Sequence, residues 1–253
     1  MTKLKIANLD GKPEIFHSIQ GEGKNMGQPS VFIRTSLCNL HCIWCDTDYT
    51  WNWEKTRFAH VKDTNPSYKK YNMKEMIISL TLEEIYDEVA KSGCKNIVLT
   101  GGEPMMQLEE LSNLMEFFNL KANDYFFEIE TNGTLLPDPR FEALIHQYNV
   151  SPKLANSNNP KKLREKPEAY KYFSKNEKAV FKFVISSEND LTEVLAICKT
   201  YKIPNQKVYL MPEGTNPEAL QKKQQWLIEI CKKYQFKYTD RLHVHIYGDK
   251  RGV

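Results

Sequence analysis

The chain has 253 residues, long enough for one α/β domain with a large buried core or for two small domains. Its hydrophobic fraction of 41% and charged fraction of 26% are ordinary for a globular protein, and a formal charge of +3 is too small to indicate nucleic-acid binding. The sequence shows no apolar run as long as a membrane span, and its first twenty residues lack the apolar core of a signal peptide. We therefore expect a cytoplasmic protein with no membrane or nucleic-acid partner.

Apolar, β-rich runs alternate with amphipathic helical patterns along the chain. The predicted strands lie at 31–37, 96–100, 125–130, 149–151, 179–186, 207–211 and 242–247. The predicted helices carry apolar stripes at 82–89, 108–118, 141–148, 191–198 and 220–231. The first helix follows Thr81, with Glu84 three residues on, which is typical of a capping box. This alternation predicts a parallel sheet with crossover helices, either open or barrel-like.

Polar or glycine-bearing segments follow five of these strands. They begin at Cys38, at Thr100-Gly101-Gly102-Glu103, at Glu130-Thr131-Asn132-Gly133, at Ser151-Pro152-Lys153 and at Met211-Pro212-Glu213-Gly214. Ligands bind at the carboxyl ends of strands in parallel α/β sheets, so we expect these segments to meet at one edge.

The segment at about 49–79 is rich in aromatic and polar residues and has no clean period. It predicts an insertion within a single domain that spans residues 1–253. Two interpretations stay open for it, a lid over the site and a peripheral packing segment.

Three cysteines, Cys38, Cys42 and Cys45, have the spacing Cys-x3-Cys-x2-Cys. In a reducing compartment so tight a group indicates metal binding rather than a disulfide. A [4Fe–4S] cluster has four irons that each take one external ligand, so three thiolates would leave one iron open for a substrate or cosubstrate. The alternative is zinc held by the three thiolates and His41, although His41 adjoins Cys42 and would have to fold back.

This cysteine spacing, with an aromatic residue before the last cysteine and Thr-Gly-Gly-Glu-Pro after the next strand, resembles the radical S-adenosylmethionine (SAM) superfamily. The resemblance implies a partial, shortened β/α barrel in which SAM chelates the open iron and a 5′-deoxyadenosyl radical takes a hydrogen atom from the substrate. It implies SAM contacts at Gly101, Gly102, Glu103, Asn132, Ser151, Pro152, Lys153, Met211, Pro212, Glu213 and Gly214. Taken alone, these segments are also ordinary turns and strand ends.

Four further stretches narrow the resemblance: FHSIQGEG at 16–23, CDT at 45–47, VSPK at 150–153 and GDKRGV at 248–253. Together they resemble the 7-carboxy-7-deazaguanine synthase family, in patches from Ile15 to the last residue. That family converts 6-carboxy-5,6,7,8-tetrahydropterin to 7-carboxy-7-deazaguanine by radical ring contraction with loss of ammonia, on the route to 7-deazapurines such as queuosine. The resemblance also implies Mg²⁺, an electron donor such as flavodoxin or ferredoxin, and a homodimer.

The family resemblance implies roles for further residues. The substrate contacts would be Ile19, Gln20, Gly21, Glu22, Arg34, Thr100 and the terminal Val253. Arg34 offers a planar fork for the substrate carboxylate. Thr47 would bind Mg²⁺, which favours hard oxygens and keeps several waters, while Asp46 is the alternative ligand on charge alone.

Two other functions stay open from the sequence. A glycyl-radical-enzyme activase would share the cysteine triad and a Gly-Gly-Glu-Pro-like segment, but it would not need SIQGEG with Arg34. A non-catalytic iron–sulfur or zinc module would not need the glycines after the second strand, or Ser151 and Lys153 at a strand end.

Overall fold

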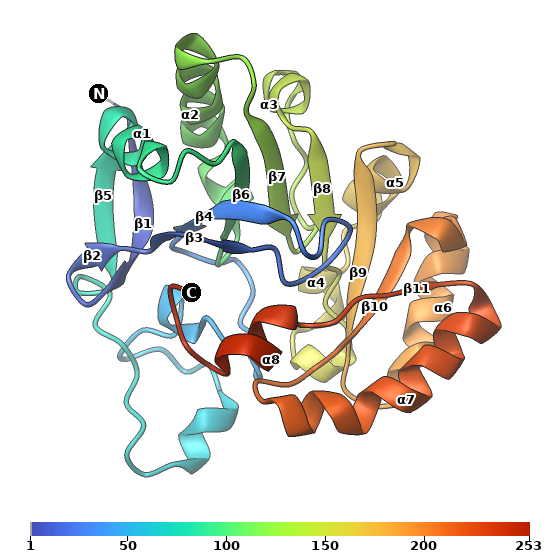
Figure 1. The fold of residues 1–253 in the computed structure, drawn as a ribbon. Helices are drawn as coiled ribbons and strands as arrows, with labels where there is room; N and C mark the ends of the chain where they lie inside the picture. The colour runs from blue at the N-terminus through green and yellow to red at the C-terminus, as the bar shows by residue number, and fades with distance from the viewer. Residues whose placement is uncertain (1) are drawn as a thin grey trace.

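Parallel strands form the centre of one sheet in the computed structural model, which describes residues 2–253 (Figure 1). They lie in the order β4-β6-β7-β8-β9-β10-β11, and the antiparallel strands β1, β2, β3 and β5 extend the β4 edge. The strands are β1 (Lys3–Leu9), β2 (Lys12–Pro13), β3 (Ile15–Ile19), β4 (Pro29–Thr35), β5 (Ile77–Thr81), β6 (Asn96–Gly101), β7 (Phe126–Thr131), β8 (Gln147–Val150), β9 (Ala179–Ile185), β10 (Val208–Pro212) and β11 (Lys237–Tyr238).

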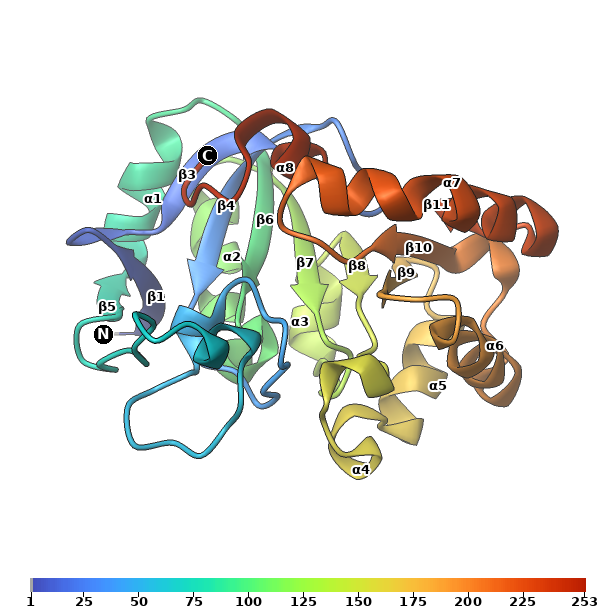
Figure 2. The ribbon, with the colours of Figure 1, turned by 90° about the horizontal axis from the view of Figure 1, so that it is seen from below.

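Helices connect and flank these strands. They are α1 (Leu82–Ala90), α2 (Leu108–Lys121), α3 (Pro139–Leu144), α4 (Lys161–Arg164), α5 (Pro167–Lys175), α6 (Asp190–Tyr201), α7 (Pro217–Tyr234) and α8 (Leu242–Tyr247). The sheet curves, and its end strands β11 and β2 do not pair with each other within the described chain (Figure 2). This open, curved sheet agrees with the predicted partial barrel. No helix among residues 2–253 is both long and apolar enough to span a membrane.

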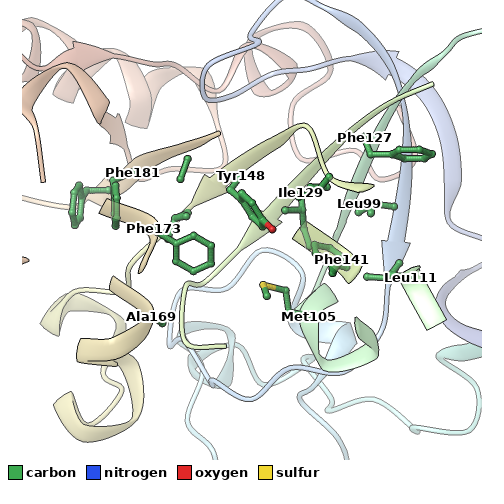
Figure 3. Packing of buried hydrophobic residues seen from close by; sticks show 14 of the residues in the cluster. Leu99, Met105, Leu111, Phe127, Ile129, Phe141, Tyr148, Ala169, Phe173 and Phe181 are labelled. Carbon is green, nitrogen blue, oxygen red and sulfur yellow. The ribbon is translucent and has the colours of Figure 1, made fainter. Parts of the chain in front are cut away.

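The two faces of the parallel strands differ in chemistry. Leu99, Ile129 and Phe181 point outward and pack with residues of the helices, among them Phe141 and Phe173 (Figure 3). The alternate positions point inward and are largely polar or charged; they include Arg34, Thr100, Glu130 and Lys182. Because side chains alternate along a strand, one face builds the core while the other lines the barrel interior.

Most predicted elements are confirmed, with shifts of up to three residues at their ends. The capping box of α1 is present, with Glu84 N donating to Thr81 Oγ1 at 3.3 Å and Thr81 N donating to Glu84 Oε2 at 2.7 Å. The helix expected over 141–148 is too long, because Ile145 is already extended and Tyr148 pairs with Ile129 in the sheet.

The strand predicted at 242–247 is wrong, since this segment is helix α8. Its alternating sequence LHVHIY imitates a strand, but only Val244 is buried, while Ile246 and Tyr247 are exposed. Leu242 N donates to Gly21 O at 2.9 Å, so the chain turns across the open end of the barrel instead of continuing along the sheet.

The sequence analysis also missed several elements. These are β1, β2, β3, β5, β11, α4 and α5. Strands β2 and β11 have two residues each and α4 has four, and β3 and β5 consist largely of partly buried residues, so their periods are weak. Strand β5 lies at the end of the segment expected as an insertion and pairs with β1 from Lys3↔Thr81 to Ala7↔Ile77. Residues 77–79 therefore belong to the sheet.

Candidate active site

A cavity of about 250 Å³ lies at the carboxyl ends of the parallel strands. All five predicted strand-end segments contribute to its wall. This agrees with the rule that ligands bind at the carboxyl ends of the strands in a parallel sheet. The wall includes these residues from the sequence analysis: Ile19, Gln20, Gly21, Glu22, Arg34, Cys38, Cys42, Cys45, Thr47, Thr100, Gly101, Gly102, Asn132, Ser151, Lys153, Met211, Glu213, Gly214 and Val253. Glu103, Pro152 and Pro212 are not part of it.

The loop after β4 carries Cys38, Cys42 and Cys45 as free thiols on the cavity wall. Burial raises the pKa of the Cys42 thiol to about 12 and also raises the pKa of Cys38 and of Cys45. A bound metal cation is needed to hold such thiols as thiolates, and three thiolates beside an open cavity fit a [4Fe–4S] cluster with one free iron.

The zinc arrangement with His41 is not formed. The His41 ring stacks on Phe58 with centroids 3.4 Å apart. Among residues 2–253, no three His, Cys, Asp or Glu side chains gather closely enough to hold one metal ion.

The two glycines after β6 are required by close backbone packing. A Cβ atom on Gly101 would lie 2.0 Å from Thr35 O, and one on Gly102 would lie 2.1 Å from Leu37 O. Gly101 also has φ +141°, which disfavours other residues. The glycines therefore let the end of β6 lie directly against the start of the cysteine loop.

Glu103 has a different position from the one expected for direct contact with SAM. Its fully buried carboxylate accepts hydrogen bonds from Asn132 N at 2.7 Å, Thr131 Oγ1 at 2.8 Å and Met105 N at 3.0 Å. Burial raises the pKa of Glu103, although these donors oppose the rise. The carboxylate thus joins the loops after β6 and β7 and does not face the cavity.

Polar groups of two strand-end loops lie on the same side of the cavity as the cysteines. Lys153 Nζ donates to Ser151 Oγ at 2.9 Å and lies 5.7 Å from the centre of the Trp44 ring. Asn132 Nδ2 donates to Asn39 Oδ1 at 2.8 Å, inside the cysteine loop. This side offers hydroxyl, amide and ammonium groups beside the thiols.

A network around Glu14 forms another part of the cavity wall. Its carboxylate accepts from Arg34 Nε at 3.0 Å, Tyr49 Oη at 3.0 Å and Arg251 Nη2 at 2.7 Å. Arg34 has its Nε committed to Glu14 and keeps its side chain on the cavity wall. The C-terminal segment is held here too, since the Arg251 guanidinium lies 3.4 Å from the centre of the Tyr49 ring.

Glu22 and Gln20 are engaged with protein groups. Glu22 pairs with Lys182 and, at 2.9 Å, with Arg241 Nε. Burial opposes ionisation, but these two cations hold the pKa of Glu22 well below its usual range. Gln20 Nε2 donates to Glu128 Oε1 at 2.6 Å, and its Oε1 accepts from Glu22 N at 3.1 Å. The side chain of Gln20 therefore shapes the loop, and its backbone does so too, since Gln20 N donates to Gln28 O and Gly27 N donates to Gln20 O, each at 2.8 Å.

Asp46 and Thr47 differ in how far their side-chain oxygens are engaged by other protein groups. Asp46 pairs with Arg241, which lowers the pKa of Asp46 against the opposing effect of burial. Thr47 Oγ1 lies 3.5 Å from Cys45 Sγ and lines the cavity. The hydroxyl oxygen of Thr47 is therefore more available to a metal ion than the carboxylate of Asp46.

Several titratable wall residues had no role assigned to them from the sequence, namely Glu14, Glu130, Lys182, Arg241, His243, Asp249 and Arg251, although Glu130, Asp249 and Arg251 lie in segments that the sequence singled out. For Lys182 a signal existed, because this lysine lies in the strand AVFKFVI, whose seven residues are all buried. A lysine in such a strand requires a carboxylate partner.

Glu128, which lies outside the cavity lining, should make the stability of the protein depend on pH. Its carboxylate accepts from the neutral amides of Gln20, Asn25 and Asn149, and burial raises the pKa of Glu128 from 4.5 to about 7. The folded state then holds a proton that the unfolded state releases, so the stabilisation is complete below pH 4.5 and is lost as the pH rises through 7. We expect the free energy of unfolding to fall by roughly 3 kcal/mol over this interval through Glu128.

Urea unfolding at a series of pH values measures this effect. Glu128→Gln should flatten the decline, whereas Glu177→Gln, at a side chain that is 92% exposed, should leave it unchanged. An unaltered pH profile in Glu128→Gln would assign the decline to other groups.

Comparison with known proteins gives consistent matches. Residues 32–227 match the Radical SAM superfamily. The chain is 33% identical to the 7-carboxy-7-deazaguanine synthase of Pyrobaculum aerophilum, over 94% of this chain and 95% of that protein. It is 36% identical to the synthase of Buchnera aphidicola, over 82% of this chain and 86% of that protein. Its fold is similar to the crystal structure of QueE from Escherichia coli, with a TM-score of 0.66 and 24% identity over 96% of each chain.

Proposed function

We propose residue roles for a chain that belongs to the 7-carboxy-7-deazaguanine synthase family of the radical SAM superfamily. The protein is a radical SAM lyase that acts on a small molecule, 6-carboxy-5,6,7,8-tetrahydropterin, and forms 7-carboxy-7-deazaguanine with loss of ammonia. The observation that carries the assignment of residues is one cavity that is lined by the three thiols together with Arg34, Thr100 and the loop at 19–22.

The thiol wall fits the cofactors of the superfamily. Cys38, Cys42 and Cys45 would hold the [4Fe–4S] cluster. When bound, the cluster and SAM supply the one-electron chemistry that starts the reaction on the substrate.

The chain itself orients SAM. The backbone of Gly101 and Gly102 allows close approach, and Asn132, Ser151 and Lys153 offer hydrogen-bond partners beside the thiols. Glu103 would act indirectly, by fixing the loop that carries Asn132. Met211, Glu213 and Gly214 extend this wall at the end of β10, with β9 between it and β8.

A second group of residues on the cavity wall fits the substrate. The Arg34 guanidinium would bind the substrate carboxylate, with Glu14 fixing its orientation through Nε. Thr100 Oγ1 donates to Glu130 Oε2 at 2.8 Å, so the hydroxyl oxygen can accept a bond from a pterin N–H. The backbone of 19–21 and the Val253 carboxylate complete this wall, and Thr47 would be the protein ligand of Mg²⁺.

The remaining expectations are proposals from the family resemblance. An external one-electron donor such as flavodoxin or ferredoxin would reduce the cluster, and the chain would form a homodimer. Thiols that ligate a cluster have to stay reduced, which supports a cytoplasmic location. The relatives reported above are named as synthases, and we retain neither the activase nor the non-catalytic module.

An anaerobic assay tests the proposed function. The protein would be reconstituted with iron and sulfide, then mixed with SAM, dithionite, Mg²⁺ and 6-carboxytetrahydropterin, and the product identified by mass spectrometry. Formation of the deazaguanine supports the assignment of substrate and cofactors together. Release of 5′-deoxyadenosine without product would still support the radical SAM chemistry, but it would contradict the assigned substrate.

Arg34→Ala should weaken substrate use and spare SAM cleavage. Loss of a charge-assisted hydrogen bond of about 1.5–3 kcal/mol predicts a rise in KM of about tenfold to hundredfold. The fold should persist, because Glu14 keeps Tyr49 and Arg251 as partners. Steady-state kinetics and uncoupled release of 5′-deoxyadenosine measure the two effects, with exposed Arg140→Ala as the control. Loss of SAM cleavage in Arg34→Ala would contradict the role of Arg34 as a carboxylate ligand.

A further inference from the structure

We propose that two buried side chains outside the cysteine motif, Trp51 and Asn159, donate N–H hydrogen bonds to cluster thiolates and raise the reduction potential of the cluster. The inference rests on the proposed role of the three cysteines as cluster ligands. It concerns side chains contributed by two segments far apart in the chain, one that follows the cysteine loop and one between β8 and α4.

Asn159 is oriented so that its amide nitrogen faces Cys42. Its Oδ1 accepts from His41 N at 2.9 Å, which leaves Nδ2 as the end that lies 3.4 Å from Cys42 Sγ. The residue is buried, and Arg164 Nε donates to its carbonyl oxygen at 3.1 Å. These contacts hold both the side chain and the backbone of Asn159, so the donor is fixed in place before any cluster binds.

Trp51 presents an orphaned donor to Cys45. Its indole Nε1 is buried and has no hydrogen-bond partner among the described residues. The indole lies beside the Cys45 thiol, where it opposes the rise in pKa that burial causes in that thiol. A neutral thiol is a weak acceptor and a thiolate is a strong one, so this N–H gains its full partner only when Cys45 is a metal ligand.

The segment that follows the cysteine loop keeps Trp51 in this position. The Trp51 ring makes edge contacts with His41, Phe58 and His60, with centroids 5.1–6.2 Å apart. His60 Nε2 lies 2.9 Å from Cys45 O. The segment at about 49–79 therefore packs directly on the cysteine loop. This role differs from both interpretations that the sequence left open, a lid over the site and a peripheral packing segment.

The third cysteine has a donor of its own, because Leu40 N lies 3.5 Å from Cys38 Sγ. Each proposed ligand sulfur thus faces one N–H group. Reduction adds negative charge to the cluster and its sulfurs, and N–H donors stabilise that charge. Removing one donor should therefore make the cluster harder to reduce while leaving its three ligands in place.

Trp51→Phe is the sharpest test, since it removes the N–H group and keeps an aromatic ring in the same packing. Trp53→Phe, in the same segment, is the matched control, and Asn159→Asp is a second variant that keeps the acceptor for His41 N and removes the donor. Each holoprotein would be reconstituted anaerobically, its iron counted, and the reduced cluster followed by electron paramagnetic resonance during a potentiometric titration.

We expect the ratio of reduced to oxidised cluster at the wild-type midpoint to fall about tenfold in Trp51→Phe, which corresponds to a midpoint lower by about 59 mV for one electron. Asn159→Asp should also lower it, and Trp53→Phe should match the wild type. Wild-type midpoints in both Trp51→Phe and Asn159→Asp, at full iron content, would overturn the proposal. Loss of iron from both would overturn it too, because the residues would then retain the cluster rather than tune it. If only one variant loses iron, the midpoint of the other decides. Absence of an iron–sulfur signal in the wild type would instead contradict the proposed function.

Discussion

Cys42→Ala should abolish both the iron–sulfur absorption of the reconstituted protein and product formation, while the chain stays folded. Cys42 is buried in the middle of the cysteine loop, and the proposed cluster has one thiolate for each of three irons. With a second iron lacking its ligand, we expect a cluster that is lost or unable to bind SAM productively, so that product falls below detection. Replacing this one buried CH2–SH side chain by a methyl group should lower the free energy of unfolding by only about 1 kcal/mol.

The chain offers matched controls for this experiment. Cys94 lies outside the cavity, where its Sγ is 3.4 Å from Pro29 O, and Cys198 is on the buried face of α6. Cys94→Ala and Cys198→Ala should both keep the wild-type absorption spectrum and product yield. Full activity in Cys42→Ala would show that another group ligates the cluster.

The part of the site that the sequence predicted consists of local motifs. Three cysteines within eight residues, two glycines after a strand and Ser151 with Lys153 at another strand end are each visible in a short window. The rule that parallel strands present their carboxyl ends at one edge was enough to bring those windows together. The curved parallel sheet followed from the alternation of strands and helices.

The missed part consists of pairs whose members lie far apart in the chain. Glu14 and Arg251 are separated by 237 positions, and Glu22 and Lys182 by 160. A charged residue in a short window looks like surface, since lysine and glutamate are mostly exposed in proteins. Only the folded chain shows that these charges meet inside the barrel and neutralise one another.

The error at 242–247 has the same origin. A six-residue alternation fits a strand and a short helix almost equally well, and the contact that decides is Leu242 N with Gly21 O. That contact joins the C-terminal segment to the SIQGEG loop, and it places Arg241 beside the cavity.

Arg241→Met should destabilise the protein by about 3–5 kcal/mol, because it removes one partner from a buried ionic network. The guanidinium donates from Nε to Glu22 Oε1 at 2.9 Å, from Nη1 to Gly214 O at 2.6 Å, and from Nη2 to Asp46. One side chain thus joins three loops: SIQGEG, the loop after β10 and the residue that follows Cys45. Methionine fills part of the volume but leaves Asp46 uncompensated, and Glu22 keeps only Lys182 as a close cation.

Urea unfolding of the protein without cofactors measures this loss apart from any effect on the cluster. Arg140→Met is the matched control, because Arg140 and Glu116 form an ion pair whose side chains are 41% and 44% exposed, and such a pair contributes at most about 1 kcal/mol. Arg241→Met with Asp46→Asn should recover part of the stability, since the second change removes the unpaired charge. If Arg241→Met unfolded like Arg140→Met, the network would be solvated and the three loops would be held by their backbone contacts. If it unfolds as expected, the binding of SAM and of substrate should weaken together, because Arg241 holds three loops that line the cavity.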